Sequence, residues 1–150
     1  GISNFPFKFC SVRWLENSKV ADRALELLEP ISLYVKNQKG LPKNTSIKNI
    51  KDNLTVVTLP LKLAFFSTVA NVLEPFLIKY QTAKPMIPFL YQDLEALLIN
   101  LLKRFVKEEF CKLRTSKLMK LNFSDKSIFL SLTKIDVGFR VKSLLKMRKL

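Results

Sequence analysis

The stretch from Met86 to Val106 most constrains what this chain can fold into. Its large apolar residues recur three or four positions apart, which is the spacing of one face of an α-helix. Lys103, Arg104 and Lys107 gather at its end, where the helix dipole favours positive charge. The apolar positions are Leu90, Leu94, Leu97, Leu98, Leu101, Leu102 and Phe105. This pattern predicts a mainly α-helical chain.

The first part of the chain is also predicted to be helical. A helix is expected to begin at Asn17 or Ser18, because both residue types are good N-caps. Pro30 lies inside its apolar pattern and is expected either to kink the helix or to divide it. Gly40 marks its stop. A polar surface loop follows, with a short helix expected from Ser46 to Leu54.

The longest apolar segment runs from Leu59 to Tyr80. Its length alone would allow it to span a membrane. However, Lys62, Glu74 and Pro75 lie inside it, and charged residues are costly in a bilayer. We therefore expect a buried helix that is kinked near Pro75, and no membrane partner.

The pattern is weaker after residue 110. Lysines alternate with leucines over residues 112–126, which predicts irregular or weakly ordered structure. A short strand is expected from Ser127 to Thr133, and a basic, modestly amphipathic helix from Asp136 to Lys149.

A length of 150 residues predicts a single domain over residues 1–150. We expect an extended arm over residues 1–16, a helical core over 17–110 and a basic C-terminal segment over 111–150. The chain begins with Gly1 rather than Met and ends in a basic run, which suggests a fragment of a longer protein.

The charge is strongly positive and unevenly distributed. The net charge is +14; residues 1–100 carry 12 Lys/Arg against 8 Asp/Glu, whereas residues 101–150 carry 14 against 4. This balance favours a polyanionic partner. Two groups of basic residues are spaced to contact a phosphate backbone. The first is Lys112, Arg114, Lys117 and Lys120, and the second is Lys142, Lys146, Arg148 and Lys149. The alternative is that they form only a solvated surface.

Enzymatic chemistry is poorly supported by the residue types. The chain has no histidine, and its three glycines are too dispersed for a phosphate-binding loop. Cys10 and Cys111 alone cannot close a zinc site, and they suit a reducing, intracellular compartment. The carboxylates Asp22, Glu26 and Glu29 are best explained as a solvated helix face. We expect no catalytic residue, no metal ligand, no cofactor and no small-molecule substrate.

Arg13 and Trp14 form a distinctive pair, because Trp14 is the only tryptophan. A guanidinium beside an indole can hold a phosphate and stack a base. The same pair can instead pack its ring into a core and leave the arginine in water. Both interpretations stay open on the residues alone.

The run of residues 8–17 around this pair resembles the Arg-Trp segment of hAT-superfamily transposases, and more specifically the transposon-derived or domesticated hAT-like proteins of animal genomes. Residues 73–90 resemble the same family, with Leu-Glu-Pro-Phe-Leu followed by Tyr-Gln-Thr-Ala-Lys-Pro-Met-Ile-Pro-Phe-Leu. Residues 134–139 add a weaker third match. The matches occur in the family order and cover most of the chain.

The resemblance implies an RNase H-like parent whose three acidic residues bind divalent metal. In that family an all-helical insertion interrupts the catalytic core between the second Asp and the final Glu. This chain would be the start of that insertion, a multi-helix domain with a short extended N-terminal segment. Both catalytic Asp residues would precede Gly1 and the Glu would follow Leu150, so no catalytic role is carried over.

The resemblance also implies roles for the Arg-Trp pair. Trp14 would stack on a base flipped out of a DNA hairpin, and Arg13 would contact the backbone. We therefore expect a nuclear, non-catalytic helical segment of an hAT transposase-like protein that supports DNA binding, with homo-oligomers formed through the parent. The alternative is a helical protein-interaction or oligomerisation scaffold with no nucleic-acid role of its own.

Overall fold

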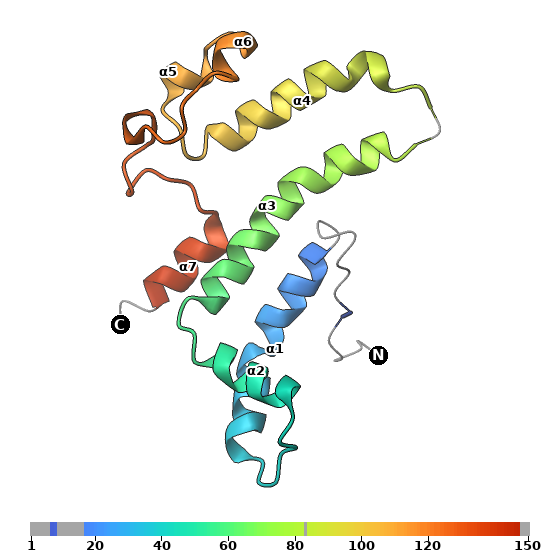
Figure 1. Cartoon of the computed structure of the whole chain (residues 1–150), viewed down its shortest axis with the longest axis vertical. Helices are drawn as coiled ribbons and strands as arrows, with labels where there is room; N and C mark the ends of the chain where they lie inside the picture. Colours follow the sequence, from blue (N-terminus) through green and yellow to red (C-terminus); the bar gives the residue numbers. More distant parts are fainter. Residues whose placement is uncertain (1–6, 9–16, 83, 148–150) are drawn as a thin grey trace. The chain divides into compact units, whose positions relative to one another are not determined.

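The computed structural model describes residues 7–8, 17–82 and 84–147, and these residues are mainly α-helical, as predicted. They contain no strand (Figure 1). Arg13, Trp14 and most of the expected arm over residues 1–16 lie outside them. The α-helices are α1 (Ser18–Asn37), α2 (Thr45–Leu54), α3 (Leu59–Tyr80), α4 (Ile87–Leu102), α5 (Glu108–Cys111), α6 (Thr115–Leu118) and α7 (Phe139–Met147).

The chain divides into two compact units. The described residues up to Asn71, together with those from Gly138 onward, form unit 1. Residues Val72–Val137 form unit 2. The boundary falls inside α3, so this helix contributes residues to both units.

In unit 1, α1 begins at Ser18, as the sequence predicts. It continues through Pro30, so the helix is not divided there, which excludes one of the two predicted outcomes. Gly40 follows the helix with a φ of 79°, a conformation that glycine adopts without a steric penalty. The short helix predicted in the next loop is α2, and it is capped by the Asn44 side chain, which accepts a bond of 2.9 Å from the Ile47 backbone N–H.

α3 runs from Leu59 to Tyr80, the range predicted from its apolar sequence. It is far less buried than predicted, because only a stripe of small residues is fully covered: Ala64, Ser67 and Ala70. Small side chains at this spacing let neighbouring helices approach the α3 backbone closely. Among the described residues, α3 is the one helix long and apolar enough to cross a membrane, a test that core helices of soluble proteins also pass.

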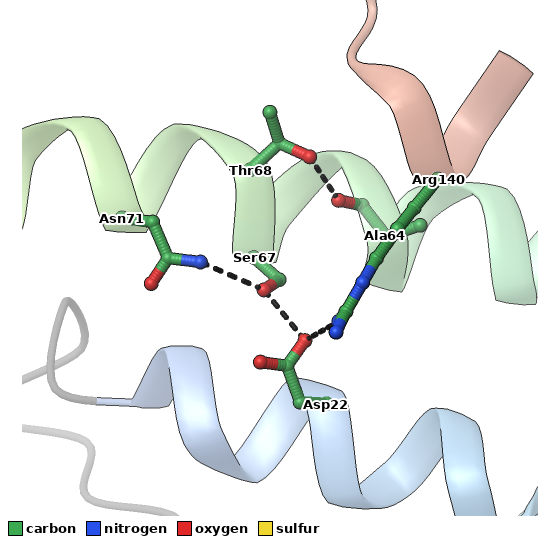
Figure 2. Close-up of polar contacts among 6 residues, drawn as sticks. All are labelled: Asp22, Ala64, Ser67, Thr68, Asn71 and Arg140. Carbon is green, nitrogen blue, oxygen red and sulfur yellow. Dashed lines mark hydrogen bonds and ion pairs between the residues drawn. The ribbon is translucent and has the colours of Figure 1, made fainter.

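A polar network joins α1, α3 and α7 within unit 1 (Figure 2). The Ser67 hydroxyl donates a bond of 2.7 Å to Asp22 Oδ1, and the Arg140 guanidinium forms an ion pair with the same oxygen. Asn71 donates to Ser67 at 3.4 Å, and Thr68 donates to the Ala64 carbonyl. Each helix therefore supplies at least one member of a partly buried network, which fixes their packing.

Unit 2 differs from the sequence prediction at the end of α4. The helix ends at Leu102, four residues before the predicted Val106. The chain then turns through bonds between residues three apart, and Val106 forms an isolated antiparallel bridge with Phe129. The predicted strand over Ser127–Thr133 is therefore wrong, because an isolated bridge does not form a β-ladder. A 3₁₀ helix, η2 (Lys126–Ile128), occupies the start of that range.

The segment predicted as irregular contains a helical turn, α6, because Thr115 and Leu118 both make contacts that hold it. The terminal helix α7 begins at Phe139 rather than at the predicted Asp136. The cause is Gly138, whose φ of 91° is incompatible with a right-handed helix.

Gly138 should be far less replaceable than Gly40. An added Cβ at Gly138 would lie 2.7 Å from Thr68 Cγ2, whereas one at Gly40 would meet nothing within 4 Å. Both positions carry the cost of a positive φ, about 1–2 kcal/mol. Gly138→Ala adds a steric clash, for a total of about 2–5 kcal/mol. Urea unfolding of Gly138→Ala and Gly40→Ala measures this difference, and equal losses would show that the close approach to Thr68 is unimportant.

Candidate nucleic-acid interface

The basic residues of unit 2 are positioned by a small apolar core. Val106, Cys111, Leu118 and Ile128 are each at most 4% exposed. The Cys111 Sγ lies 3.9 Å from the Val106 carbonyl oxygen, and burial raises the pKa of this thiol, so it packs as a small apolar group. Backbone bonds from Lys107 to the Ile128 carbonyl (2.9 Å) and from Leu130 to that of Phe105 (2.8 Å) join the two sides of this core.

The four residues predicted as phosphate contacts lie between and beside two of these buried side chains, Cys111 and Leu118. Because Cys111 and Leu118 occupy the interior, the lysines and arginine between and beside them are left in solvent. All four side chains are exposed: Lys112, Arg114, Lys117 and Lys120. They thus lie within nine consecutive positions, along α5, α6 and the turns that follow them. The structure places them on one short, fixed segment.

Lys112 has an acidic partner. Its Nζ lies 2.7 Å from Glu108 Oε1, and this hydrogen bond raises the pKa of Lys112 and lowers that of Glu108. Both side chains are more than 70% exposed, so the pair is weak. Arg114, Lys117 and Lys120 form no ion pair within the part of the chain that the structure describes. Three positive charges are therefore uncompensated at close range.

Two further cations, Lys103 and Lys107, belong to the same region. Sequence reasoning assigned them only to the end of a helix dipole, but both are exposed and follow α4. Lys103 helps to lower the pKa of Glu108, and Lys107 helps to lower that of Asp125, after the hydrogen bonds those carboxylates accept. The basic segment, residues 103–126, carries eight Lys/Arg against three Asp/Glu. The charge count of this segment could have identified Lys103 and Lys107 as part of a basic surface, but the helical pattern assigned them to a helix end.

Polar contacts tie the basic segment to neighbouring elements of unit 2. The Thr115 hydroxyl bonds to the Glu95 carboxylate and so joins α6 to α4. Arg104 donates to the Asp136 carbonyl at 3.1 Å and forms an ion pair of 3.3 Å with the same residue's carboxylate. These contacts hold the segment near its start and near its middle.

α3 and α4 are joined by a second cluster, at Asp93. The Tyr80 hydroxyl donates a bond of 2.6 Å to Asp93 Oδ2, and Lys79 forms an ion pair with the same oxygen. Partial burial and the carboxylate raise the pKa of Tyr80 to about 12. The hydrogen bonds from Lys79 and Tyr80 lower the pKa of Asp93. The cluster is stable only while the carboxylate is ionised and the phenol is neutral.

The remaining predicted residues lie in unit 1 or outside the described residues. Lys142 and Lys146 lie exposed on α7 in unit 1. Arg13, Trp14, Arg148 and Lys149 lie outside the described residues, so the structure places none of them. The Asp22 network of Figure 2 is ionic, and its contacts join helices of unit 1.

The arrangement can bind anions through exposed ammonium and guanidinium groups. Within the described ranges, no three His, Cys, Asp or Glu side chains are grouped to hold a metal ion. Comparison of the chain with protein-family models, with curated protein sequences and with solved structures finds no match.

The Asp93 cluster should make the stability of the protein depend on pH. Its carboxylate has a lowered pKa when folded, so its contribution is present above the ordinary aspartate value near 3.9 and is lost as the pH falls through the lower folded value. Urea midpoints of the wild type and Asp93→Asn should therefore differ most at pH 6 and converge below about pH 4.

Tyr80→Phe is the matched control for this titration. It removes the hydroxyl bond but keeps the carboxylate and its ion pair with Lys79, so most of the acid-dependent loss should remain. The wild type should also weaken as the pH rises from 10 towards 12, where the tyrosine ionises, and Tyr80→Phe should lack this loss. A stability difference between wild type and Asp93→Asn that does not change with pH would contradict the assignment.

Proposed function

We propose that this chain is a non-catalytic helical segment of an hAT transposase-like protein, and that it supports DNA binding in the nucleus. The proposal is supported by the three ordered sequence matches at residues 8–17, 73–90 and 134–139, and by the net charge of +14. The mainly α-helical fold is compatible with the helical insertion of that family.

The observation that carries the DNA-binding role is the exposure of Lys112, Arg114, Lys117 and Lys120 on a segment held by its own core. Cations of this kind bind phosphates, release counterions and give affinity without reading sequence. A fixed segment loses little conformational entropy when it meets a phosphate backbone. In this proposal the basic segment supplies affinity and register, and Arg13 and Trp14 contact a hairpin end, with Trp14 stacked on a flipped base.

The direct test replaces all four side chains by glutamine and measures binding to hairpin DNA over a series of salt concentrations. Each phosphate contact adds about 0.9 to the slope of log affinity against log salt for duplex DNA. At low salt the variant is expected to bind hairpin DNA at least about tenfold more weakly than the wild type. The magnitude of its salt slope should be smaller by about 3–4. Fluorescence anisotropy with labelled hairpin DNA measures both quantities.

A matched control removes the same charge elsewhere. Four exposed lysines on or beside α1 and α2 in unit 1 are changed to glutamine, so both variants have equal net charge: Lys36, Lys43, Lys48 and Lys51. If the proposal is right, this control keeps most of the affinity and slope. Equal losses in both variants would indicate general attraction to a basic protein and would overturn a role for the basic segment.

A scaffold role is the second candidate, and one feature of α4 favours it. None of its residues is fully buried, although the helix is strongly apolar. Ile87, Tyr91 and Leu94 recur at helical spacing and are 82%, 63% and 46% exposed. Such a stripe is the kind of surface by which amphipathic helices pair.

The scaffold candidate predicts that mass rises with concentration. Sedimentation equilibrium should then show assemblies larger than the 17.3 kDa chain, and Tyr91→Lys combined with Leu94→Lys should restore the single-chain mass. Leu132→Lys is the control, because Leu132 is 89% exposed in the same unit but lies outside the stripe. A wild type that stays at 17.3 kDa at all concentrations would exclude self-association through α4.

A further inference from the structure

We propose that Phe123 is a stacking platform for an unpaired base, and that the basic segment around it binds single-stranded nucleic acid. The inference rests on the proposed nucleic-acid role of that segment and adds its substrate class. It concerns a residue to which the sequence analysis gave no function, and its support comes from the turn that carries Phe123, from the exposure of its ring and from the charges beside it.

Phe123 occupies the second position of a tight turn that is braced three times. The Asp125 backbone N–H donates a bond of 3.0 Å to the Asn122 carbonyl, which closes the turn. The Asn122 side chain accepts a bond of 3.0 Å from the Ser124 N–H. The Asp125 side chain accepts one of 2.8 Å from the Ser127 N–H and so fixes the start of η2. The backbone of Phe123 is thereby held in place.

The ring of Phe123 is only about half covered by the rest of the protein. It is 51% exposed, while Leu118 and Ile128 on either side in sequence are almost completely buried. The fold therefore supplies the apolar anchors of this region without Phe123. A half-exposed aromatic ring on a braced turn offers a flat surface for stacking, and the backbone that carries it needs little ordering on binding.

Lysines lie on both sides of this ring in sequence, and the turn itself also holds the Asp125 carboxylate. Lys120 precedes Phe123 by three residues and Lys126 follows it by three, and both are exposed. Lys107 lies near enough to Asp125, in the same turn, to help lower the pKa of that carboxylate. A phosphate backbone running along these lysines would bring its bases to the level of the ring.

These features favour a single strand over a duplex. Stacking on an aromatic side chain needs a base with a free face, which a single strand offers and an intact duplex hides. Lysines at fixed spacing follow the phosphates of either form. The lysines therefore give affinity for both, and Phe123 adds affinity only for unpaired bases.

The test compares the full chain with Phe123→Ala, using a labelled oligo-dT of about 15 nucleotides and a duplex of the same length as probes. Loss of one stacking platform should weaken oligo-dT binding by about 5- to 150-fold. Duplex binding should change less than about twofold, because the charges are unchanged. Phe123→Trp should keep the oligo-dT affinity, since the indole also stacks, and so excludes a trivial folding defect.

Phe139→Ala is the control for exposed aromatic rings in general. Phe139 is 83% exposed on α7 in unit 1, and its removal should change neither affinity. Unchanged oligo-dT binding by Phe123→Ala, with wild-type binding intact, would overturn this inference alone. Equal weakening on both probes would also overturn it. Failure of the wild type to bind either probe would overturn the proposed function as well.

Discussion

The exposed charge of unit 2 depends on a very small apolar core. Its buried side chains are Val106, Cys111, Leu118 and Ile128. The bridge between Val106 and Phe129, with the backbone bonds beside it, joins the chain segments that carry them. Burying these side chains leaves their charged neighbours facing solvent, among them Lys107, Lys112 and Lys117. The basic segment is thus a consequence of packing, and it would lose its geometry if this core opened.

Unit 1 depends on a different constraint, which is close approach between helices. The stripe of small residues on α3 and the absence of a side chain at Gly138 allow this approach, and the Asp22 network completes it with directed bonds. A buried network of this kind stabilises only when all its members are present. The packing of α1, α3 and α7 in unit 1 therefore combines small buried side chains with directed polar contacts.

Local sequence patterns predicted much of the helical fold. The starts of α1 and α3, the short α2 and the end of α3 follow from caps, prolines and apolar runs. The predictions for the end of α4 and for a strand near Phe129 were wrong, because Val106 and Arg104 pair with Phe129 and Asp136, which no local sequence pattern contains. The four exposed cations could be predicted, whereas the roles of Lys103 and the braced turn at Phe123 required the structure.

The central claim, that the basic segment contacts nucleic acid, is tested most directly by NMR of the isotope-labelled chain during titration with hairpin DNA. The account predicts that the largest amide shift changes occur within residues 103–126, and that α1 and α2 change little. The side-chain signals of Arg114 should move at the same DNA concentrations as these amides. Shift changes centred on α1 and α2, or none at saturating DNA, would contradict the account.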